Sequence, residues 1–319
     1  MSIPRFLAGI VPVGLLILGA GLASGQDYPN KPIRIVTGAT GGGSDFTARI
    51  AAQGISGPLG QSVVVENRTV LLATEAVAKA PSDGYTLVVN GNSLWILPML
   101  QKTGYDATRD FSPISQLVRE FTVLAVHPSL PVKSVKDLIA LAKARKGELN
   151  YSTGAVGALS HLGMELFKSM AGVDIVHVPY KGGTAQTAAL LSGEVQLTIA
   201  DANWVMPQAK AGRLRALAVT SAQPTALVPG LPTVAELGLP GFEATSTTGI
   251  WAPAKTPEAI IKRLSQEIMR VFNQPDVKVK YSNAGVETVG NPPEQFAAFI
   301  KSDAARWGKV IKDAGIKLD

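Results

Sequence analysis

Residues 34–53 read "RIVTGATGGGSDFTARIAAQ", an apolar run that leads through a glycine cluster into a helix-like segment. The run at 33–37 predicts a short buried strand, and residues 44–55 predict a helix with Ser44 or Asp45 as its N-cap. Glycines at the start of a helix leave backbone N–H groups free at the positive end of the helix dipole. The stretch therefore predicts an anion site, either for the phosphates of a cofactor or for a smaller ligand.

A dinucleotide cofactor is the first alternative, because the next strand ends near Glu66, where a ribose-binding acid could lie. The spacing argues against it. The loop reads G-x-x-G-G-G rather than G-x-G-x-x-G, and Glu66 lies 28 residues past Gly38 (66 − 38) rather than about 20. No tyrosine is followed four residues later by a lysine, so the Tyr–Lys pair of short-chain dehydrogenases is absent. A smaller ligand such as a carboxylate or phosphate is the better prediction.

Strands and helices alternate along the chain in two series, which predicts an α/β protein with parallel strands flanked by helices. Two such series indicate two lobes with a cleft between them, and ligands in such sheets lie at the carboxyl ends of strands. We expect the helical tail after residue 252 to complete the first lobe, with the chain crossing between lobes near 121–127 and 244–252. Strands are predicted at 62–67, 85–91, 121–128, 149–153, 174–180, 195–201 and 214–220, and helices at 74–80, 134–147, 160–172, 257–274 and 292–315.

The composition narrows the class of protein. The chain has 319 residues, of which 46% are hydrophobic and 17% charged, as in a well-buried globular protein. The net charge is +6, but Lys and Arg form no long run, so no nucleic-acid partner is expected. The absence of cysteine excludes thiolate metal sites, disulfides and a cysteine nucleophile.

The N-terminus has the pattern of an export signal. Arg5 precedes a long apolar stretch, no further charge occurs before Asp27, and small residues follow at 23–25. This predicts a signal peptide over residues 1–25, and the alternative is an uncleaved membrane anchor. The glycines and proline within the stretch favour cleavage, so the mature protein is expected outside the cytoplasm.

A second loop has the same organisation as the first. Residues 150–167, "NYSTGAVGALSHLGMELF", again run from strand through small residues into a helix, and residues 179–193 add a third turn with a helix capped by Thr184. Two such loops on either side of a cleft could grip the two ends of a dicarboxylate. The alternative, which spacing alone leaves open, is that both are ordinary turns.

Candidates for metal binding or catalysis are few. His161 and Glu165 share a helix face, but no third ligand is apparent, so a capping or packing role is predicted. Neither a G-x-S-x-G serine motif nor an H-E-x-x-H zinc motif occurs. Asp201 ends a strand, where it could act as a base, accept a hydrogen bond from a ligand, or cap the following helix. Trp95 and Trp251 could line the cleft.

Several stretches resemble the Bug-type receptors of tripartite tricarboxylate transporters, which are periplasmic solute-binding proteins. The resemblance covers nearly the whole mature chain. It is carried by "YPNKPIRIV" (28–36), "GGSD" (42–45), "VVVENR" (63–68), "PSDGYTL" (81–87), "HPSLPVKSVKDLIALAK" (127–143), "SHLGMELFKSMAGVDIVHVPYKGG" (160–183), "GRLRALAVTS" (212–221), "LPTVAELGLPGFEA" (231–244) and "WAPAKTP" (251–257).

The resemblance implies a two-lobed, type II periplasmic-binding-protein (Venus-flytrap) fold, each lobe a mixed, mostly parallel sheet flanked by helices. Lobe 1 would comprise 26–122 and 246–319, and lobe 2 would comprise 123–245. The family holds carboxylates through one loop from each lobe, which correspond by position to 38–45 and 151–160. The implied ligand-binding residues are Gly38, Thr40, Gly41, Gly42, Gly43, Ser44, Asp45, Asn90, Asn92, Ser93, Ser152, Thr153, Gly154, Gly157, Ser160 and Asp201.

The chain departs from the family pattern within these loops. Gly38 replaces a typical aromatic residue, and Val156 and Ala158 stand where polar residues are common. We therefore expect a roomier or more apolar pocket, open to an aromatic or larger carboxylate as well as to a di- or tricarboxylate.

The expected function is that of a monomeric periplasmic receptor that captures an organic carboxylate and passes it to membrane transporter subunits. No catalysis, cofactor or metal is expected. Two alternatives remain. One is a sensor that presents its loaded form to a signalling partner, and the other is an exported enzyme with Asp201 or His161 as base.

Overall fold

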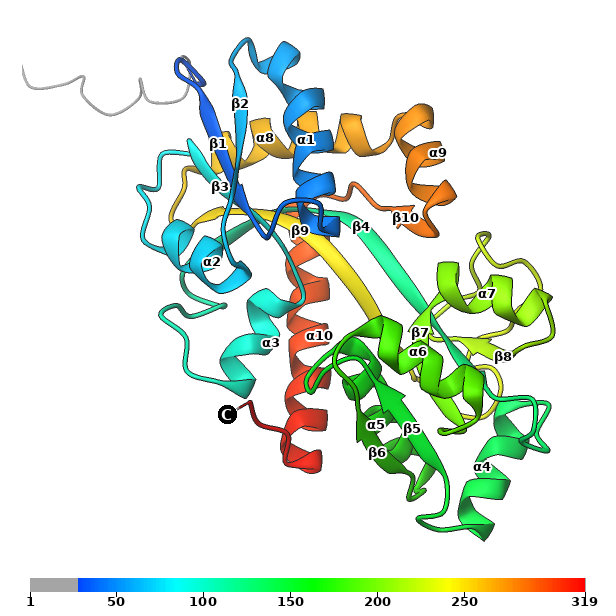
Figure 1. The fold of residues 1–319 in the computed structure, drawn as a ribbon. Helices are drawn as coiled ribbons and strands as arrows, with labels where there is room; N and C mark the ends of the chain where they lie inside the picture. The colour runs from blue at the N-terminus through cyan, green and yellow to red at the C-terminus, as the bar shows by residue number, and fades with distance from the viewer. Residues whose placement is uncertain (1–27, 319) are drawn as a thin grey trace, which may run out of the picture.

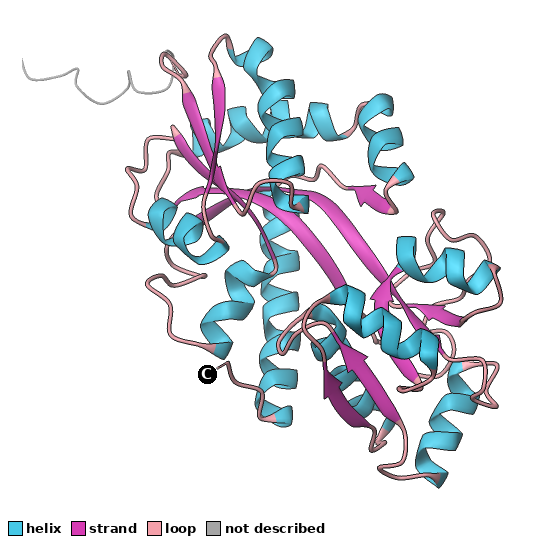
Figure 2. Cartoon of the chain, in the orientation of Figure 1, coloured by secondary structure: helices cyan, strands magenta, loops and turns pink. Residues whose placement is uncertain are grey.

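A computed structural model describes residues 28–318, which form a mixed sheet flanked by helices (Figures 1 and 2). The strands follow the order β2-β1-β3-β9-β4-β7-β5-β6, and β8 and β10 also pair with β4. The expected α/β class is confirmed. The strands are β1 (Ile33–Thr37), β2 (Val63–Asn67), β3 (Thr86–Gly91), β4 (Phe111–Val126), β5 (Asn150–Thr153), β6 (Val176–Pro179), β7 (Leu197–Asp201), β8 (Arg215–Val219), β9 (Thr245–Pro253) and β10 (Val286–Thr288).

The helices cover both ends of this sheet. They are α1 (Gly43–Leu59), α2 (Val70–Ala78), α3 (Ser93–Leu100), α4 (Val135–Ala144), α5 (Leu159–Ala171), α6 (Gly183–Ser192), α7 (Ala202–Lys210), α8 (Glu258–Phe272), α9 (Pro275–Asn283) and α10 (Pro293–Ala314). In the helical tail, α8 packs against α1 and β4, and α10 packs against β4, α3 and α5. None of the helices within residues 28–318 combines the length and apolar character that a membrane crossing requires.

The long strand β4 joins two groups of strands (Figure 1). Up to Phe121 it pairs antiparallel with β9, and from Thr122 onward it pairs antiparallel with β7. The first group contains β1, β2, β3, β9 and β10, and the second contains β5, β6, β7 and β8. Parallel pairs occur within β1–β3 and among β5–β7, whereas every pair made by β4 is antiparallel.

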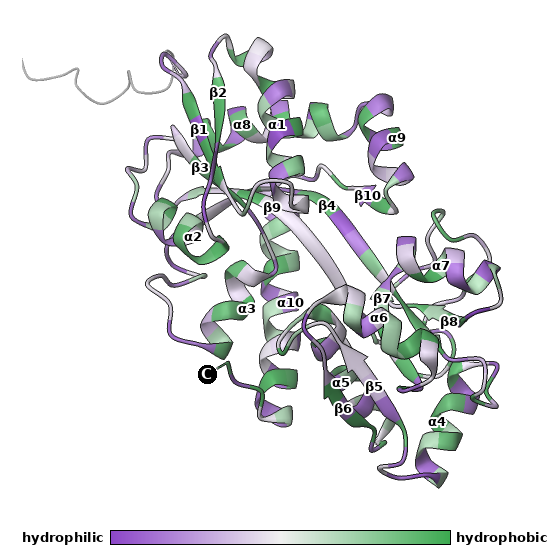
Figure 3. Ribbon diagram, viewed as in Figure 1, coloured by the Kyte–Doolittle hydropathy of each residue, from purple (hydrophilic) through white to green (hydrophobic). Residues whose placement is uncertain are grey.

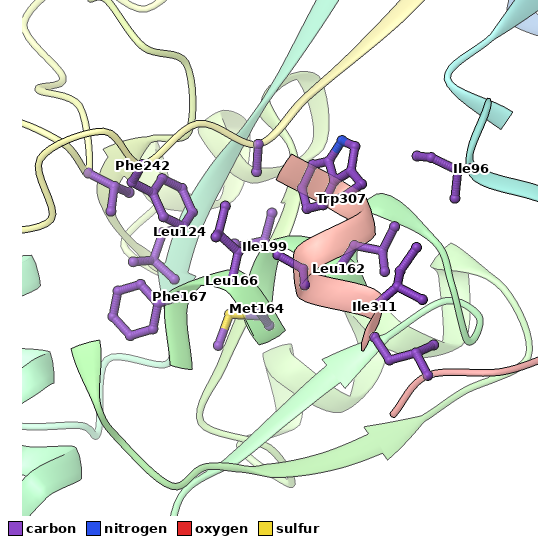
Figure 4. Close-up of a cluster of buried hydrophobic side chains, with 14 of the residues drawn as sticks. Ile96, Leu124, Leu162, Met164, Leu166, Phe167, Ile199, Phe242, Trp307 and Ile311 are labelled. Atoms are coloured by element: carbon purple, nitrogen blue, oxygen red, sulfur yellow. The ribbon is translucent and has the colours of Figure 1, made fainter. Parts of the chain in front are cut away.

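The hydrophobic core crosses the boundary between the two groups. One buried cluster includes Trp95 on α3 and Trp251 on β9, together with Leu124 on β4 and Phe167 on α5. Figure 4 shows part of this cluster around α10. The prediction that Trp95 and Trp251 line the cleft is wrong, since they are only 2% and 1% exposed. Large apolar rings gain more from burial against other side chains than from facing water.

A buried carboxylate ties three elements of this core together. Asp303 on α10 is fully buried and accepts hydrogen bonds from the side chains of Asn92 and Trp95, both at 2.9 Å, and it also pairs with Arg306. Asn92 in turn accepts a hydrogen bond from the backbone N–H of Thr247 at 2.6 Å. This network fixes the start of α3 against β9 and α10, because each polar atom in it loses water and needs a partner.

Local predictions from the sequence had mixed outcomes. Ser134 caps α4 as predicted, with its Oγ accepting from the N–H of Asp137 at 3.1 Å. The predicted caps at the glycine turns are wrong, because α1 and α6 have Gly42 and Gly182 as N-caps rather than Ser44, Asp45 or Thr184. The first ten residues of β4 and all of α3, α9, β9 and β10 were not predicted. The predicted signal peptide at 1–25 lies outside the described residues.

Candidate functional site

Three adjoining hollows lie along the boundary between the two strand groups. The α1 hollow, about 510 Å³, is lined by 41–43 at the start of α1 and by Glu120, Asp201 and Tyr281. The α5–α6 hollow, about 470 Å³, is lined by Gly154, Ser160, Gly183, Thr184, Gln186, Asp201 and Trp204. The α3 hollow, about 410 Å³, is lined by α3 and residues 155–159. Asp201 joins the first two hollows, and Ala158 and Leu159 join the second to the third.

The first glycine loop keeps its shape through a buried aspartate. The Asp45 carboxylate accepts the backbone N–H of Gly41 at 2.9 Å and the Asn67 amide at 2.8 Å, and it pairs with Arg49 at 3.0 Å. Asn67 also donates to the carbonyl of Gly38 at 2.8 Å. Burial raises the pKa of Asp45, but hydrogen bonds from Arg49, Asn67 and Gly41 outweigh it and hold that pKa below its usual range.

This shape leaves the first turn of α1 without partners. Gly42 is the N-cap and makes no side-chain capping bond, and within residues 28–318 no acceptor contacts the backbone N–H groups of Gly43, Ser44 or Asp45. Gly41 supports the turn with a left-handed φ of +82°, which favours glycine. Free N–H groups at a helix start carry partial positive charge and attract anions.

The second group of strands presents two more helix starts of the same kind. α5 and α6 have Ala158 and Gly182 as N-caps, again with no side-chain capping bond. The two loops are linked, since the N–H of Gly182 donates to the carbonyl of Gly154 at 2.8 Å. In the described part of the chain, the N–H groups of Leu159 and Ser160 in α5 and of Gly183 and Thr184 in α6 have no acceptor, whereas the N–H of His161 donates to the carbonyl of Ala158 at 2.9 Å.

A pair of stacked histidines supports the α5 loop from behind. The rings of His161 and His177 lie 4.1 Å apart at an angle of 12°, and His161 Nδ1 accepts the N–H of Gly157 at 3.1 Å. His177 Nε2 lies 2.7 Å from the Oγ1 of Thr153. Burial, with a smaller effect from His177, lowers the pKa of His161 to about 4. The capping and packing role expected of His161 is therefore confirmed.

The α1 hollow also contains two carboxylates. The carboxyl groups of Glu120 and Asp201 make no hydrogen bond or ion pair within residues 28–318. The Oε1 of Glu120 lies 3.8 Å from the position that a Cβ on Gly43 would occupy. Burial raises the pKa of both carboxyl groups, and Asp201 adds to the rise at Glu120. Asp201 is the N-cap of α7 but its side chain makes no capping bond, so it is free to face the cleft. Figure 3 colours this middle part of β4 as hydrophilic.

No cationic side chain lines the three hollows in the described part of the chain. Their electrostatic character therefore comes from helix starts and from the two carboxylates. Nor do any three His, Asp or Glu residues within 28–318 group as metal ligands would.

The predicted site residues fall into two sets. One set lines the hollows: Gly41, Gly42, Gly43, Asn92, Ser93, Gly154, Gly157, Ser160 and Asp201. The other set lies around or behind them: Gly38, Thr40, Ser44, Asp45, Asn90, Ser152 and Thr153. In the second set Asn90 is 3% exposed and bonds with Thr74 and Ser93, while Thr153 is fully buried against His177.

Several lining residues were not singled out from the sequence for this site, and four of them show why. Glu120 belongs to the part of β4 that was not predicted, and Gln186 and Trp204 lie inside helices, where spacing gives no sign of a cleft. Tyr281 lies more than two hundred residues from the first loop, yet its hydroxyl bonds to Thr47 on α1 at 3.0 Å. Only the tertiary fold brings such residues to one place.

Comparisons with known proteins place these features in context. Residues 47–316 match the family described as "Tripartite tricarboxylate transporter family receptor". Protein BugT of Bordetella pertussis is 35% identical over the full length of both chains. An R. palustris protein solved with adipate is 38% identical with a TM-score of 0.72, covering 91% of this chain and 99% of that one. MatC from Rhodopseudomonas palustris, solved with bound malate, is 26% identical with a TM-score of 0.68, covering 89% of this chain and all of its own.

Proposed function

Because the chain belongs to the tripartite tricarboxylate transporter receptor family, a family of non-enzymatic solute-binding receptors, we propose that it captures an organic carboxylate in the cleft between its two strand groups. Relatives solved with adipate and with malate support this class of ligand. The receptor would then deliver the carboxylate to membrane transporter subunits, after export to the periplasm with removal of residues 1–25.

One observation carries the proposal. Helices α1, α5 and α6 begin at adjoining hollows, and the N–H groups of their first two residues have no acceptor within residues 28–318. Free N–H groups at helix starts attract anions, and no cation lines the hollows in this part of the chain to compete for one. A carboxylate supplies two oxygens that accept several such bonds at once. Ser160 and Thr184 add hydroxyl groups beside the N–H groups of α5 and α6.

The cleft would close by a hinge motion. We propose lobe 1 as 26–122 with 246–319 and lobe 2 as 123–245, so that β4 and β9 connect the lobes. A carboxylate that bonds to α1 from lobe 1 and to α5 or α6 from lobe 2 makes both sets of bonds only when the lobes are together. Ligand binding therefore favours the closed state.

Other predicted residues would act by positioning these helix starts. We propose that Asp45 holds the first loop, since it accepts the N–H of Gly41, and that Asn92 anchors α3, since its amide already bonds to Asp303 and Thr247. Thr153 would hold the second loop through His177. These side chains are occupied and support the site without needing to contact a ligand.

The test removes single N–H donors without changing charge in the cleft. Gly43 and Gly183 are the first residues of α1 and α6, where proline fits the helix but has no N–H. Gly43→Pro and Gly183→Pro should each weaken carboxylate binding at least tenfold in calorimetry against a panel of carboxylates. Glu258→Pro, at the same position of the remote helix α8, is the matched control. Unchanged binding in both cleft variants, with normal folding by circular dichroism, would contradict the assignment.

A further inference from the structure

The α3 hollow differs in chemistry from the other two. Its walls include Ile96, Leu97 and Leu100 on α3, with Val156 and Leu159 opposite. Leu318, near the end of the chain, closes one side, and its N–H donates to the carbonyl of Leu100 at 3.1 Å. No charged side chain lines this hollow in the described part of the chain.

Two of the three polar side chains that line the α3 hollow within residues 28–318 are already engaged, and the third is Ser246 on β9. Asn92 bonds to Asp303, and Ser93 donates from its Oγ to Asn90 at 2.9 Å. The hollow therefore has little to offer a second charged or hydroxylated group. Binding becomes more favourable when hydrocarbon of the ligand replaces water at the apolar wall of the hollow, because burial of apolar surface is the main favourable contribution to such contacts.

The α3 hollow opens onto the anion-binding helix start. Ala158 and Leu159 line both the α3 hollow and the α5–α6 hollow, and Leu159 is also the first residue of α5. A carboxylate held by the first turn of α5 would thus have its remaining atoms within reach of the α3 hollow. Figure 4 shows Leu162, one turn further along α5, beside Ile311 and Trp307, so the floor of this hollow is fixed core.

The opposite direction is unfavourable for a second anionic group. There the cleft leads to Asp201, which lines both the α5–α6 and the α1 hollows, and beyond it to Glu120 in the α1 hollow; neither carboxyl group has a side-chain partner within residues 28–318. A second carboxylate placed between them, in addition to the one at the helix starts, adds further like charge at short range. An apolar tail that turns toward α3 avoids this repulsion.

We propose, building on the proposed function, that the α3 hollow binds the hydrocarbon part of the ligand. The ligand class is a carboxylate with an aliphatic chain or aromatic ring, and Leu97 and Val156 select for it. Gly157 keeps the entrance open. It has a φ of +77°, and a Cβ there would lie 2.9 Å from the Cδ1 of Leu100.

The experiment uses calorimetry on the whole mature chain with acetate, butyrate, hexanoate, octanoate and 3-phenylpropionate, and with succinate and malate for comparison. Affinity should rise about fourfold for each methylene that enters the hollow. Hexanoate should then bind more tightly than succinate. The affinity for acetate measures the contribution of the carboxylate group alone.

Variants in the wall of the α3 hollow test where the hydrocarbon part of the ligand binds. Val156 is 40% exposed, so Val156→Asn should fold normally and remove the dependence on chain length. Leu97→Asn is a second wall variant. Met99→Asn, on the same helix but outside the lining, is the matched control and should retain the dependence.

Two outcomes would overturn the proposal, and they differ. The α3 subsite would be contradicted if carboxylates bind without any dependence on chain length, or if succinate and malate bind more tightly than hexanoate. Either result would leave the proposed function unaffected. Failure of every carboxylate to bind to the folded wild-type protein would contradict both. A chain-length dependence that survives in Val156→Asn and Leu97→Asn would place the tail elsewhere.

Discussion

The two glycine loops present similar helix starts but are held by different chemistry. The loop at 38–45 depends on a charged network around Asp45. Its carboxylate accepts hydrogen bonds from the N–H of Gly41 and the Asn67 amide, and it forms an ion pair with Arg49. The loop at 154–160 depends on neutral imidazoles stacked behind it. Similar helix starts are thus supported by an ionised group in one loop and by uncharged groups in the other, and we expect their sensitivities to mutation and pH to differ.

The largest expected effect comes from the charged network. Asp45→Ala leaves the Gly41 N–H without its acceptor, removes one of the two acceptors of the Asn67 amide and leaves Arg49 without its carboxylate, which we expect to lower the free energy of unfolding by about 3 kcal/mol. Carboxylate affinity should fall at least tenfold because the loop loses its shape. Chemical denaturation and calorimetry measure the two quantities.

Asp137→Ala is the control for this variant. Asp137 also accepts a backbone N–H four residues before it, from Lys133 at 2.9 Å, but it is exposed and remote from the cleft. It should lose less stability and no affinity. If Asp45→Ala loses no more than Asp137→Ala, the first loop does not depend on the charged network.

A smaller effect is expected from the histidine-supported loop, and it depends on pH. The folded pKa of His161 is about 4, below its unfolded value of about 6.5, because burial disfavours the charged ring. The unfolded chain therefore binds more protons between these values. Stability is highest above about pH 6.5 and falls as pH drops toward 4, by roughly 2 kcal/mol from this group.

The measurement is urea denaturation from pH 7.5 to 4.5. His161→Gln should reduce the slope of stability against pH, because the titrating group is gone. His127→Gln, which removes a surface histidine bonded to Ser129, should keep the wild-type slope. A wild-type slope in His161→Gln would show that the stacked pair is not the source.

The smallest effect separates backbone shape from binding. Gly41 and Gly60 both have left-handed φ values, +82° and +67°, and both have open space where a Cβ would stand. Alanine at either position should destabilise the fold by about 1 kcal/mol through backbone strain. Only Gly41→Ala should weaken carboxylate binding, by a few fold in calorimetry, since Gly60 lies at the far end of α1. Equal affinities in the two variants would remove the first loop from the site.

Much of the first loop could be predicted from the sequence because its signal is local. A strand, three consecutive glycines and a helix lie within twenty residues, so the free N–H groups at the start of α1 follow from short-range geometry. The same reasoning found the loop before α5. It misjudged the caps, because Asp45 uses its carboxylate to accept the N–H of Gly41 at the entrance of the turn rather than to cap α1.

The remaining features depend on contacts between distant parts of the chain. Asn67 locks the first loop across 22 residues, and Asp303 anchors Asn92 across 211, so neither partner is visible from spacing. Strand β4 pairs with β9 up to Phe121 and with β7 from Thr122 onward. Glu120 lines the cleft because it lies next to this change of partner strand.

The sequence by itself determined the α/β class, the two glycine-containing loops that lead into helices, and the family. It could do so because strand and helix periods, glycine turns and family motifs are all local patterns. The tertiary structure alone decided which helix starts meet, which carboxylates face them, and that an apolar hollow closed by Leu318 lies beside α5. Those outcomes depend on the packing of surfaces far apart in the chain, which no local pattern encodes.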